Sequence, residues 1–411
     1  MKIKEPLLKP ELTAPAGTYE KLVWAAQYGA DAVYFGTDFG SLRAYAGNFT
    51  LDDAAKGIKF LHKNGKKGFV TLNIYPFSDE YDKLLDIAGN LQDAQADALI
   101  VSDIGLIFEL KKAGIKTPIH ISTQANTTSS QAVLAYRQLG AARVNLAREL
   151  SLEQIKQICK DTLQTGVELE VFVHGAVCFS YSGRCAISDY LTGRKANRGE
   201  CTHPCRWEYY IVEEKRPGEY FPVFEDQRGQ YLFNSKDLAL FEFVEPLAQA
   251  GVTSFKIEGR MKSVHYIASV ISLYRQLIDG KKISSEDCLK LLSRVKNRGY
   301  STGFMKGSIT PDDYSYEKSQ SKSGAVFVGN ITDEKIEQGS ICFVRNKIFA
   351  GEKLEVLTPA GEISEITTPN PLKTIDGEST EFINNPQKIV LEQKLPAYSI
   401  LRRVIEVSNK K

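Results

Sequence analysis

Several features are missing from this sequence of 411 residues, and each absence excludes a class of protein. The 52 lysines and arginines are balanced by 50 acidic residues, and the net charge of +2 excludes a globally basic nucleic-acid-binding protein. Any contact with RNA would therefore depend on a local basic patch. No apolar run approaches the ~20 residues that span a bilayer, and the first residues lack the apolar segment of a secretory signal. We expect a cytoplasmic protein without membrane contacts.

Common catalytic motifs are absent as well. The sequence contains no Gly-x-Ser-x-Gly elbow, no His-Glu-x-x-His motif and no Gly-x₄-Gly-Lys-Ser/Thr loop. These absences argue against an ordinary serine hydrolase, a zincin metalloprotease and a P-loop nucleotide triphosphatase. The chemistry must therefore be sought in a less common constellation of residues.

Cysteine is scarce, but its distribution is uneven. Seven cysteines are too few for a disulfide scaffold. Four of them, Cys178, Cys185, Cys201 and Cys205, follow the pattern C-x₆-C-x₁₅-C-x₃-C. Four thiolates can hold a tetrahedral zinc ion or an iron–sulfur cluster, and neither close pair has the C-x₂-C spacing usual in zinc knuckles. The spacing favours an iron–sulfur cluster over structural zinc, with His203 as an alternative ligand and unligated cysteines as the remaining interpretation.

The first two thirds of the chain alternate between short apolar segments and helical patterns. Such alternation indicates a parallel sheet covered by helices, and eight strands predict a (β/α)₈ TIM-like barrel. A doubly wound open sheet fits the same alternation, but no Gly-x-Gly-x-x-Gly follows any strand. The expected strands are Glu11–Ala14, Ala32–Gly36, Gly68–Ile74, Ala98–Ser102, Ile119–Thr123, Arg143–Leu146, Leu169–His174 and Ser254–Glu258, and the expected helices include Tyr19–Tyr28, Leu51–Lys63, Ser129–Leu139 and Leu152–Cys159.

The pattern also predicts the organisation of the domains. The barrel domain covers residues 1–305 and includes an insertion at 175–253 between the seventh and eighth strands, well beyond an ordinary loop. A polar linker at 306–323 precedes a small all-β barrel at 324–411. Within the insertion we expect a hairpin at Tyr220–Phe233 and a helix introduced by Asn234–Asp237; two helices, Val264–Asp279 and Ser285–Lys296, close the barrel domain.

Residues that follow the strands of a barrel meet on one face, where barrel enzymes build their sites. This rule brings together a set of polar side chains whose number exceeds what packing requires. Asp103 also fits the role of a helix cap. The other members are Asn73, Gln124, Arg148, Glu149, His174, Glu258 and Arg260.

The cysteine-rich segment is cationic. Between positions 184 and 206 the net charge is +3, and the densest group is the basic loop, Arg194-Lys195-Ala-Asn-Arg198. These cations either compensate an anionic thiolate cluster or form a phosphate-binding rim. Trp207 beside them favours the rim, since aromatic side chains stack on unpaired bases. Arg194, Lys195, Arg198 and Trp207 are thus candidates for RNA binding.

Longer motifs carry a family resemblance. The run Glu170-Val-Phe-Val-His-Gly-Ala-Val-Cys-Phe-Ser-Tyr-Ser-Gly-Arg-Cys185 resembles the signature of the collagenase-like U-32 peptidase family. Further elements agree in order, namely Pro15–Gly17, Gly29–Tyr34, Ser122–Asn126 and Lys256–Arg260. Within the family, Cys201–Tyr209 and Arg216–Tyr220 resemble a branch that hydroxylates tRNA.

The resemblance implies an activity. Members of that branch install a hydroxyl group on carbon five of the wobble uridine of tRNA, with prephenate implicated as the source. Related branches that hydroxylate ubiquinone precursors carry [4Fe–4S] clusters on four cysteines, which implies that Cys178, Cys185, Cys201 and Cys205 are the ligands here. The cluster, tRNA and prephenate are therefore the expected cofactor and partners, with a partner subunit unknown.

Prephenate carries two carboxylates, so its pocket would need cations. Arg148, Lys256 and Arg260 are candidates, and the alternative is that they form ion pairs with Glu149 and Glu258. Asn73 and Gln124 are the other expected substrate-binding residues, and His174 and Glu258 the expected catalytic ones.

Two further functions stay open. The family name suggests a peptidase acting on collagen-like substrates, for which His174 and Cys178 would form the dyad. A non-catalytic iron–sulfur protein that serves a partner enzyme in RNA modification is the third possibility.

Overall fold

The computed structural model describes residues 9–42, 48–178, 180–207, 225–226, 229–230, 235–310, 313 and 323–405. The chain divides into two compact units. The first consists of Met1–Ala26, Ala30–Lys262 and Arg298–Ser321, and the second of Gln27–Gly29, Ser263–Asn297 and Lys322–Lys411.

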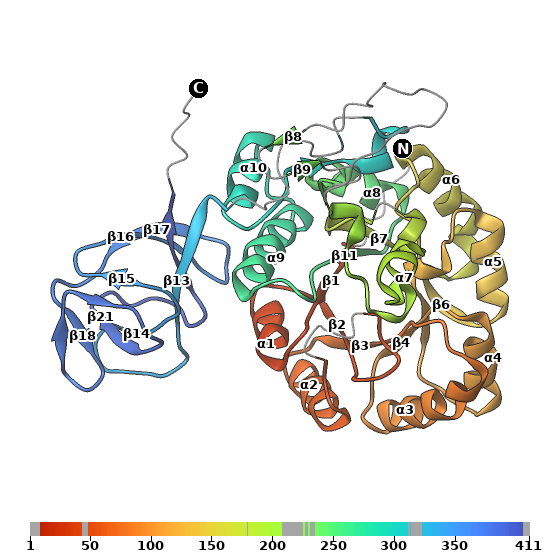
Figure 1. Cartoon of the computed structure of the whole chain (residues 1–411), viewed down its shortest axis with the longest axis horizontal. Coiled ribbons are helices and arrows are strands. Elements are labelled where there is room, and N and C mark those ends of the chain that lie inside the picture. The colour runs from red at the N-terminus through yellow and green to blue at the C-terminus, as the bar shows by residue number, and fades with distance from the viewer. Residues whose placement is uncertain are drawn as a thin grey trace, which may run out of the picture. The chain divides into compact units, whose positions relative to one another are not determined.

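Eight parallel strands close into a barrel in the first unit (Figure 1). Each strand pairs with the next one along the chain, and β11 pairs with both β7 and β1. The predicted (β/α)₈ barrel is therefore confirmed, and the open-sheet alternative is wrong. The strands are β1 (Glu11–Pro15), β2 (Ala32–Gly36), β3 (Lys67–Leu72), β4 (Ala98–Val101), β5 (Ile119–Ile121), β6 (Ala141–Asn145), β7 (Glu168–Gly175) and β11 (Ser254–Ile257).

Helices form a ring around these strands (Figure 1). Their first turns are capped as the sequence predicts: Asp103 accepts a hydrogen bond from the Leu106 amide at 2.7 Å, and Ser151 and Gln154 form a reciprocal capping box. In the part of the chain that the structure describes, no helix is long and apolar enough to cross a membrane. The helices are α1 (Tyr19–Gln27), α2 (Leu51–Lys63), α3 (Tyr81–Asp93), α4 (Ile104–Lys112), α5 (Ser130–Gln138), α6 (Leu152–Thr162) and α8 (Val244–Ala250).

The interior of the barrel contains a buried charge network. Arg143 on β6 contacts Glu11 on β1 at 2.7 Å, and this contact crosses the interior because the two strands are not neighbours. Glu170 on β7 accepts hydrogen bonds from Lys256 at 2.7 Å and from Asn145 at 2.8 Å. Buried charges of this kind are tolerated only when they are paired. The network therefore links β1, β6, β7 and β11 through side chains as well as through backbone pairing.

The insertion after β7 differs from the expectation in one element. The predicted hairpin agrees with β8 (Glu225–Asp226) and β9 (Gly229–Gln230), which pair antiparallel. A helix does follow Asn234–Asp237, but it begins only at Val244 with α8, because Asp237–Ala239 first forms strand β10, which pairs antiparallel with the end of β7. The end of β7 offers backbone groups beyond the register of β6, and β10 occupies them.

The second unit contains an antiparallel all-β domain, as predicted for residues 324–411. Helices α9 (Val264–Ile278) and α10 (Ser285–Ser293) belong to this unit by their contacts, since His265 stacks on Phe327 with ring centroids 5.6 Å apart. Most of the expected linker, 306–323, lies outside the described residues, so that boundary stays a prediction. In sheet order the strands are β17 (Ile363–Thr367), β16 (Lys353–Leu357), β22 (Ile400–Val404), β13 (Ala325–Ile331), β14 (Ser340–Val344), β21 (Lys388–Leu391), β18 (Leu372–Thr374) and β19 (Ser379–Thr380).

Candidate functional site

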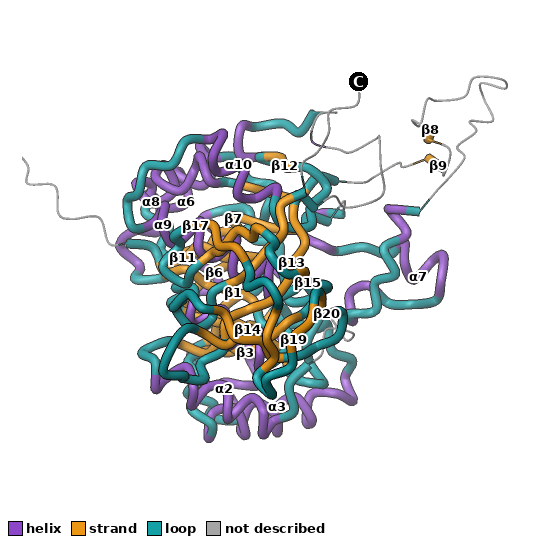
Figure 2. Tube along the Cα trace, turned by 90° about the vertical axis from the view of Figure 1, so that its left-hand side faces the viewer, coloured by secondary structure: helices purple, strands orange, loops and turns teal. Residues whose placement is uncertain are grey.

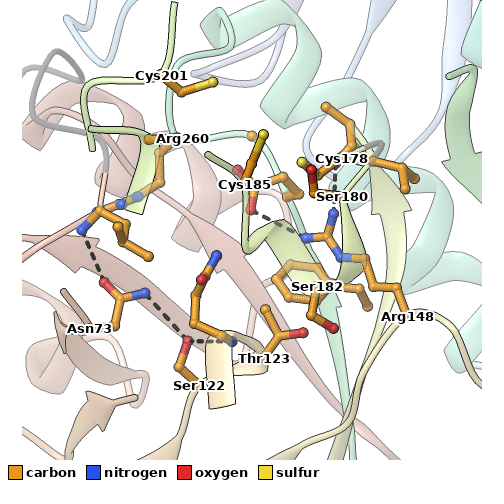
Figure 3. A pocket seen from close by; sticks show the side chains of 18 of the residues that line it. Asn73, Ser122, Thr123, Arg148, Cys178, Ser180, Ser182, Cys185, Cys201 and Arg260 are labelled. Carbon is orange, nitrogen blue, oxygen red and sulfur yellow. Dashed lines mark hydrogen bonds and ion pairs between the residues drawn. The ribbon is translucent and has the colours of Figure 1, made fainter. Parts of the chain in front are cut away.

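A cavity of about 390 Å³ lies at the carboxyl ends of the barrel strands. Its lining comes from β2, β3, β4, β6, β7 and β11, from the segments that follow several of these strands and β5, and from the insertion. Figure 3 shows the labelled cysteines Cys178, Cys185 and Cys201 on one side of it and Asn73 and Ser122 on the other. The predicted site residues that line this cavity are Asn73, Gln124, Arg148, Lys256, Glu258, Arg260, Cys178, Cys185, Cys201 and Cys205.

A polar shelf forms the side of the cavity opposite the cysteines. The Asn73 side chain accepts a hydrogen bond from the Leu42 amide at 3.1 Å and donates one to Ser122 Oγ at 3.4 Å. Ser122 Oγ also accepts from the Gln124 amide at 3.3 Å (Figure 3). These bonds fix Asn73 and Ser122 against each other, so this wall can present ordered donors and acceptors to a ligand.

Arg148 also lines the cavity, and its charge is partly neutralised. Its guanidinium group lies 3.9 Å from the centroid of the Phe172 ring and donates to the Ala176 carbonyl at 2.7 Å. A terminal nitrogen lies 3.7 Å from a Glu258 carboxylate oxygen. The expected alternative of an ion pair with Glu258 is therefore confirmed for Arg148. Its Nε atom is buried and has no hydrogen-bond partner among the described residues.

Lys256 also reaches the cavity, but its partner is neither of the two glutamates expected from the sequence. Its Nζ donates to Glu170 at 2.7 Å and lies 4.5 Å from the centroid of the Tyr34 ring. Burial lowers the pKa of Lys256, and the nearby Glu170 carboxylate opposes this effect. Burial alone would raise the pKa of Glu170, but Lys256 and Arg143 hold it at about 2. The pair is therefore charged inside the barrel.

Arg260 and Glu149 organise two other parts of the wall. The buried guanidinium group of Arg260 donates to Ser41 Oγ at 2.6 Å and to Thr71 Oγ1 at 3.2 Å. Glu149 accepts hydrogen bonds from the amide and, at 2.8 Å, from the hydroxyl of Ser182. Ser182 has a φ of 45°, a left-handed conformation that these two bonds hold in place. Glu149 thus positions the insertion and does not pair with the predicted cations.

The segments that bear the cysteines are held by local hydrogen bonds. Cys185 precedes α7 (Ile187–Thr192), and the Asn197 side chain bonds to both its amide and its carbonyl at 3.4 Å. Thr202, next to Cys201, is bonded to Ser188 on α7 by its amide at 3.1 Å and by its hydroxyl at 3.0 Å. The hydrogen bonds between Ser188 on α7 and Thr202 therefore link the segment that follows Cys185 to the segment that bears Cys201.

The donor set fits a thiolate-ligated metal centre, whereas the positions of the thiols are not those of an assembled one. All four side chains line one cavity. Within the described ranges, no group of three or more His, Cys, Asp or Glu residues is arranged to hold a metal ion. Cys178 is exposed at its surface, but the protein atoms that surround its thiol raise the pKa of this group, and the nearby thiols of Cys185 and Cys201 raise it further. Nearby thiolates repel each other unless a cation lies between them.

His174, the expected catalytic histidine, does not line the cavity. It is buried near the end of β7, opposite Ala239 of β10, and its ring centroid lies 5.5 Å from that of Tyr300. Burial lowers the pKa of His174 to about 3. Glu258 therefore lines the cavity, whereas the His174 side chain is buried outside the cavity lining.

The basic loop contacts the segment between β3 and α3. Arg198 forms an ion pair with Glu80, and its guanidinium group lies 4.7 Å from the Phe77 ring centroid. Arg194 and Lys195 are exposed, and Lys195 Nζ lies 5.1 Å from the same ring. Trp207 is also exposed and lies outside the cavity lining. Arg198 is thus held by a carboxylate, while Arg194 and Lys195 are accessible to a partner.

Sequence reasoning missed several residues of the cavity because they lie within strands. Tyr34, Asn145 and Phe172 line it from β2, β6 and β7. Alternation along a barrel strand marks such inward positions, but β2 is apolar throughout (AVYFG), so nothing in its sequence distinguishes the inward Tyr34 from its neighbours. The sequence pattern could identify residues that follow the strands, because these residues are polar and the strand residues before them are mostly apolar.

Comparisons with known proteins agree with this architecture. The family model "Peptidase family U32" matches residues 17–313, and that of the "Peptidase family U32 C-terminal domain" matches residues 324–402. The tRNA hydroxylation protein P of Escherichia coli K12 is 38% identical over 402 residues, which cover 87% of this chain and 88% of that protein. The 23S rRNA 5-hydroxycytidine C2501 synthase of the same strain is 37% identical over 270 residues, covering 66% of this chain and 39% of that protein.

One relative has a different name. A protein named collagenase from Porphyromonas gingivalis W83 is 33% identical over 314 residues, which cover 72% of this chain and 73% of that protein. The match to the family model extends over most of the chain and includes the cysteine-bearing insertion. From these matches it follows that the chain belongs to peptidase family U32.

Proposed function

We propose that this protein hydroxylates RNA, and more specifically that it installs a hydroxyl group on carbon five of the wobble uridine of tRNA. The relative named tRNA hydroxylation protein P matches over most of both chains, and a second relative is named for hydroxylation of a cytidine in rRNA. The observation that carries the proposal is the cavity at the barrel mouth, which is lined by four cysteines and by Arg148, Lys256 and Arg260.

The four cysteines are proposed to hold a [4Fe–4S] cluster, with structural zinc as the less favoured metal. Such a cluster, when bound, supplies redox chemistry at the site. The chain's own contribution is to position the ligands. Asn197 holds the backbone at Cys185, and the bonds between Ser188 and Thr202 hold the backbone beside Cys201. The thiols line one cavity, and these segments would have to move to bring them to a single centre.

The cations are proposed to bind prephenate or a similar dicarboxylate. Arg148 has a buried Nε atom without a partner in the described structure, and Arg260 is bonded to the hydroxyls of Ser41 and Thr71. A carboxylate that replaces Glu258 beside Arg148 would gain a charge-assisted hydrogen bond. Lys256 is already paired with Glu170, so its contribution is a positive field in the cavity wall.

A peptidase is the second candidate, and the relative named collagenase is the observation that favours it. The proposed dyad of His174 and Cys178 lacks support, because His174 is buried away from the cavity that Cys178 lines. Purified protein should therefore leave denatured collagen intact. Cleavage at enzyme-like rates that His174→Ala abolishes would instead favour the peptidase.

The decisive experiment measures the modified nucleoside. Deletion of the gene should remove 5-hydroxyuridine from tRNA digests, and the wild-type gene, but not Cys201→Ser, should restore it. Unchanged 5-hydroxyuridine in the deletion strain would contradict the proposal. Purified, cluster-loaded protein with tRNA and prephenate tests the accessory alternative, because an accessory protein would undergo redox changes without forming product.

A further inference from the structure

Two phenylalanines are exposed side by side in the all-β domain. Phe349 on β15 (Ile348–Phe349) is 41% exposed, and Phe382 on β20 (Phe382–Ile383) is 50% exposed. The two strands form a separate antiparallel ribbon in which Phe349 is opposite Phe382, and Figure 2 shows the strands side by side. Their neighbours Ile348 and Ile383 are buried in the domain core. Because successive side chains of a strand point to opposite faces, the two aromatic rings point away from the domain core.

Cations accompany both rings. Lys347 Nζ lies 4.8 Å from the ring centroid of Phe349 and 4.5 Å from that of Phe382. The guanidinium group of Arg403 lies 5.5 Å from the Phe349 centroid. We call Lys347, Phe349, Phe382 and Arg403 the aromatic platform. Arg403 is paired with Glu352, whereas no ion pair of Lys347 occurs among the described residues.

The backbone beneath the platform is fixed. The Phe349 amide donates to Glu352 at 3.0 Å, and its carbonyl accepts from Thr368 Oγ1 at 2.7 Å. The Phe382 carbonyl accepts from Thr380 Oγ1 at 3.0 Å. Rings on a rigid ribbon lose little conformational freedom when a ligand stacks on them, which favours binding.

We infer that the aromatic platform binds RNA by stacking unpaired bases on Phe349 and Phe382, whose ring planes are tilted by 47° to each other, while Lys347 contacts a phosphate. Exposed aromatic rings accept bases of any sequence, and an unneutralised cation beside them complements the charge of the backbone. The inference relies on the proposed function for the identity of the RNA as tRNA. It assigns a binding surface to the C-terminal domain, separate from the cysteine-lined cavity.

The experiment uses the full chain and measures its affinity for tRNA and for an oligouridylate of about ten nucleotides. The double variant Phe349→Leu/Phe382→Leu retains apolar side chains but removes the rings, so binding of both RNAs should weaken about tenfold or more. Phe349→Tyr/Phe382→Tyr keeps the rings and should bind within about twofold of the wild type. Lys347→Gln should lower the salt dependence of binding by about one phosphate contact.

Matched controls come from the same domain. Ile363, on β17, and Ile375 are 42% and 49% exposed, so Ile363→Ala and Ile375→Ala remove comparable apolar surface outside the platform. Both should bind RNA like the wild type, and thermal unfolding should show that all variants fold.

The outcomes separate this inference from the proposed function. If the leucine variant binds RNA as the wild type does, or the tyrosine variant loses binding too, stacking on the platform is disproved; a protein partner would then be the alternative occupant. If the wild type has no measurable RNA affinity, the inference also fails. If the leucine variant alone loses RNA binding but no protein forms 5-hydroxyuridine, the platform stands and the proposed activity fails.

Discussion

Lys256 on β11 donates a hydrogen bond to Glu170 on β7 at 2.7 Å, so the two strands whose pairing closes the barrel are also joined by a buried ion pair. Ser254 supplies a second bond to the same carboxylate at 2.9 Å. Buried pairs of this kind contribute little net stability when intact, but leave an uncompensated charge when one partner is removed. The pair therefore makes the closure of the barrel sensitive to single substitutions.

Glu170→Gln should lower the free energy of unfolding at neutral pH by about 3–5 kcal/mol, because the buried Lys256 loses its counter-charge. Adding Lys256→Met should recover most of this loss. Chemical denaturation provides the measurement. Glu153 and Lys156 lie the same 2.7 Å apart on the exposed surface of α6, and Glu153→Gln should cost less than about 1 kcal/mol. Equal effects at both sites would contradict the interpretation of the buried pair.

Each of the substitutions Cys178→Ser, Cys185→Ser, Cys201→Ser and Cys205→Ser should abolish the iron and sulfide content and the brown colour of protein purified without oxygen. A cluster loses a ligand in each variant, and serine is a poor replacement for a soft thiolate. Cys159→Ser is the control, since Cys159 is buried in α6. Stoichiometric zinc in the wild type, or iron unaffected in any of the four variants, would contradict the assignment.

The basic loop should divide into an RNA-binding part and a structural part. Arg194→Ala/Lys195→Ala should weaken tRNA binding and reduce its salt dependence by about two phosphate contacts, because both side chains are exposed. Arg198→Ala should instead resemble Glu80→Gln, since the two residues form one ion pair. Filter binding over a range of salt concentrations distinguishes them. If the double variant changes iron content but not tRNA affinity, the cations compensate the thiolates.

The stability of the protein should fall as the pH drops from about 6.5 towards about 3, partly because of His174. Its folded-state pKa is lowered to about 3, so between these limits the unfolded chain binds a proton that the folded chain does not. His174→Gln should therefore flatten this slope in part, since His120 and His265 are buried with lowered pKa values too. Denaturation at several pH values measures the slope. A large loss of hydroxylation with unchanged stability would restore His174 as a catalytic candidate.

Gly175→Ala should destabilise the junction between β7 and the cysteine-bearing insertion. Gly175 has a φ of 116°, and a Cβ at this position would lie 2.5 Å from the Glu258 carbonyl oxygen. A cost above about 1 kcal/mol follows from the conformation, and the close approach adds to it. Gly193→Ala, also at a positive φ but in open space, is the control and should cost less. Similar losses in both variants would show that the contact with Glu258 is unimportant.

Sequence patterns were sufficient for elements whose apolar runs are bounded by turn residues. Strand Ala32–Gly36 and helix Leu51–Lys63 were predicted at their observed bounds. Strand β10 was missed because its pairing with β7 depends on a contact far along the chain. The same reason applies in the site, where Glu80 lies 118 positions from Arg198 and no local pattern connects them. Positions after strands could be predicted, whereas long-range partners could not.

The pairing of β10 with β7 has a consequence for how this fold diversifies. The chain leaves the barrel at Gly175, and Leu238 of β10 comes back beside it as its direct partner before the chain continues to β11. The stretch between these two residues therefore begins and ends at the same place, beside the end of β7. Its length and content can therefore change without moving either end, so the barrel should tolerate insertions and deletions between these two residues.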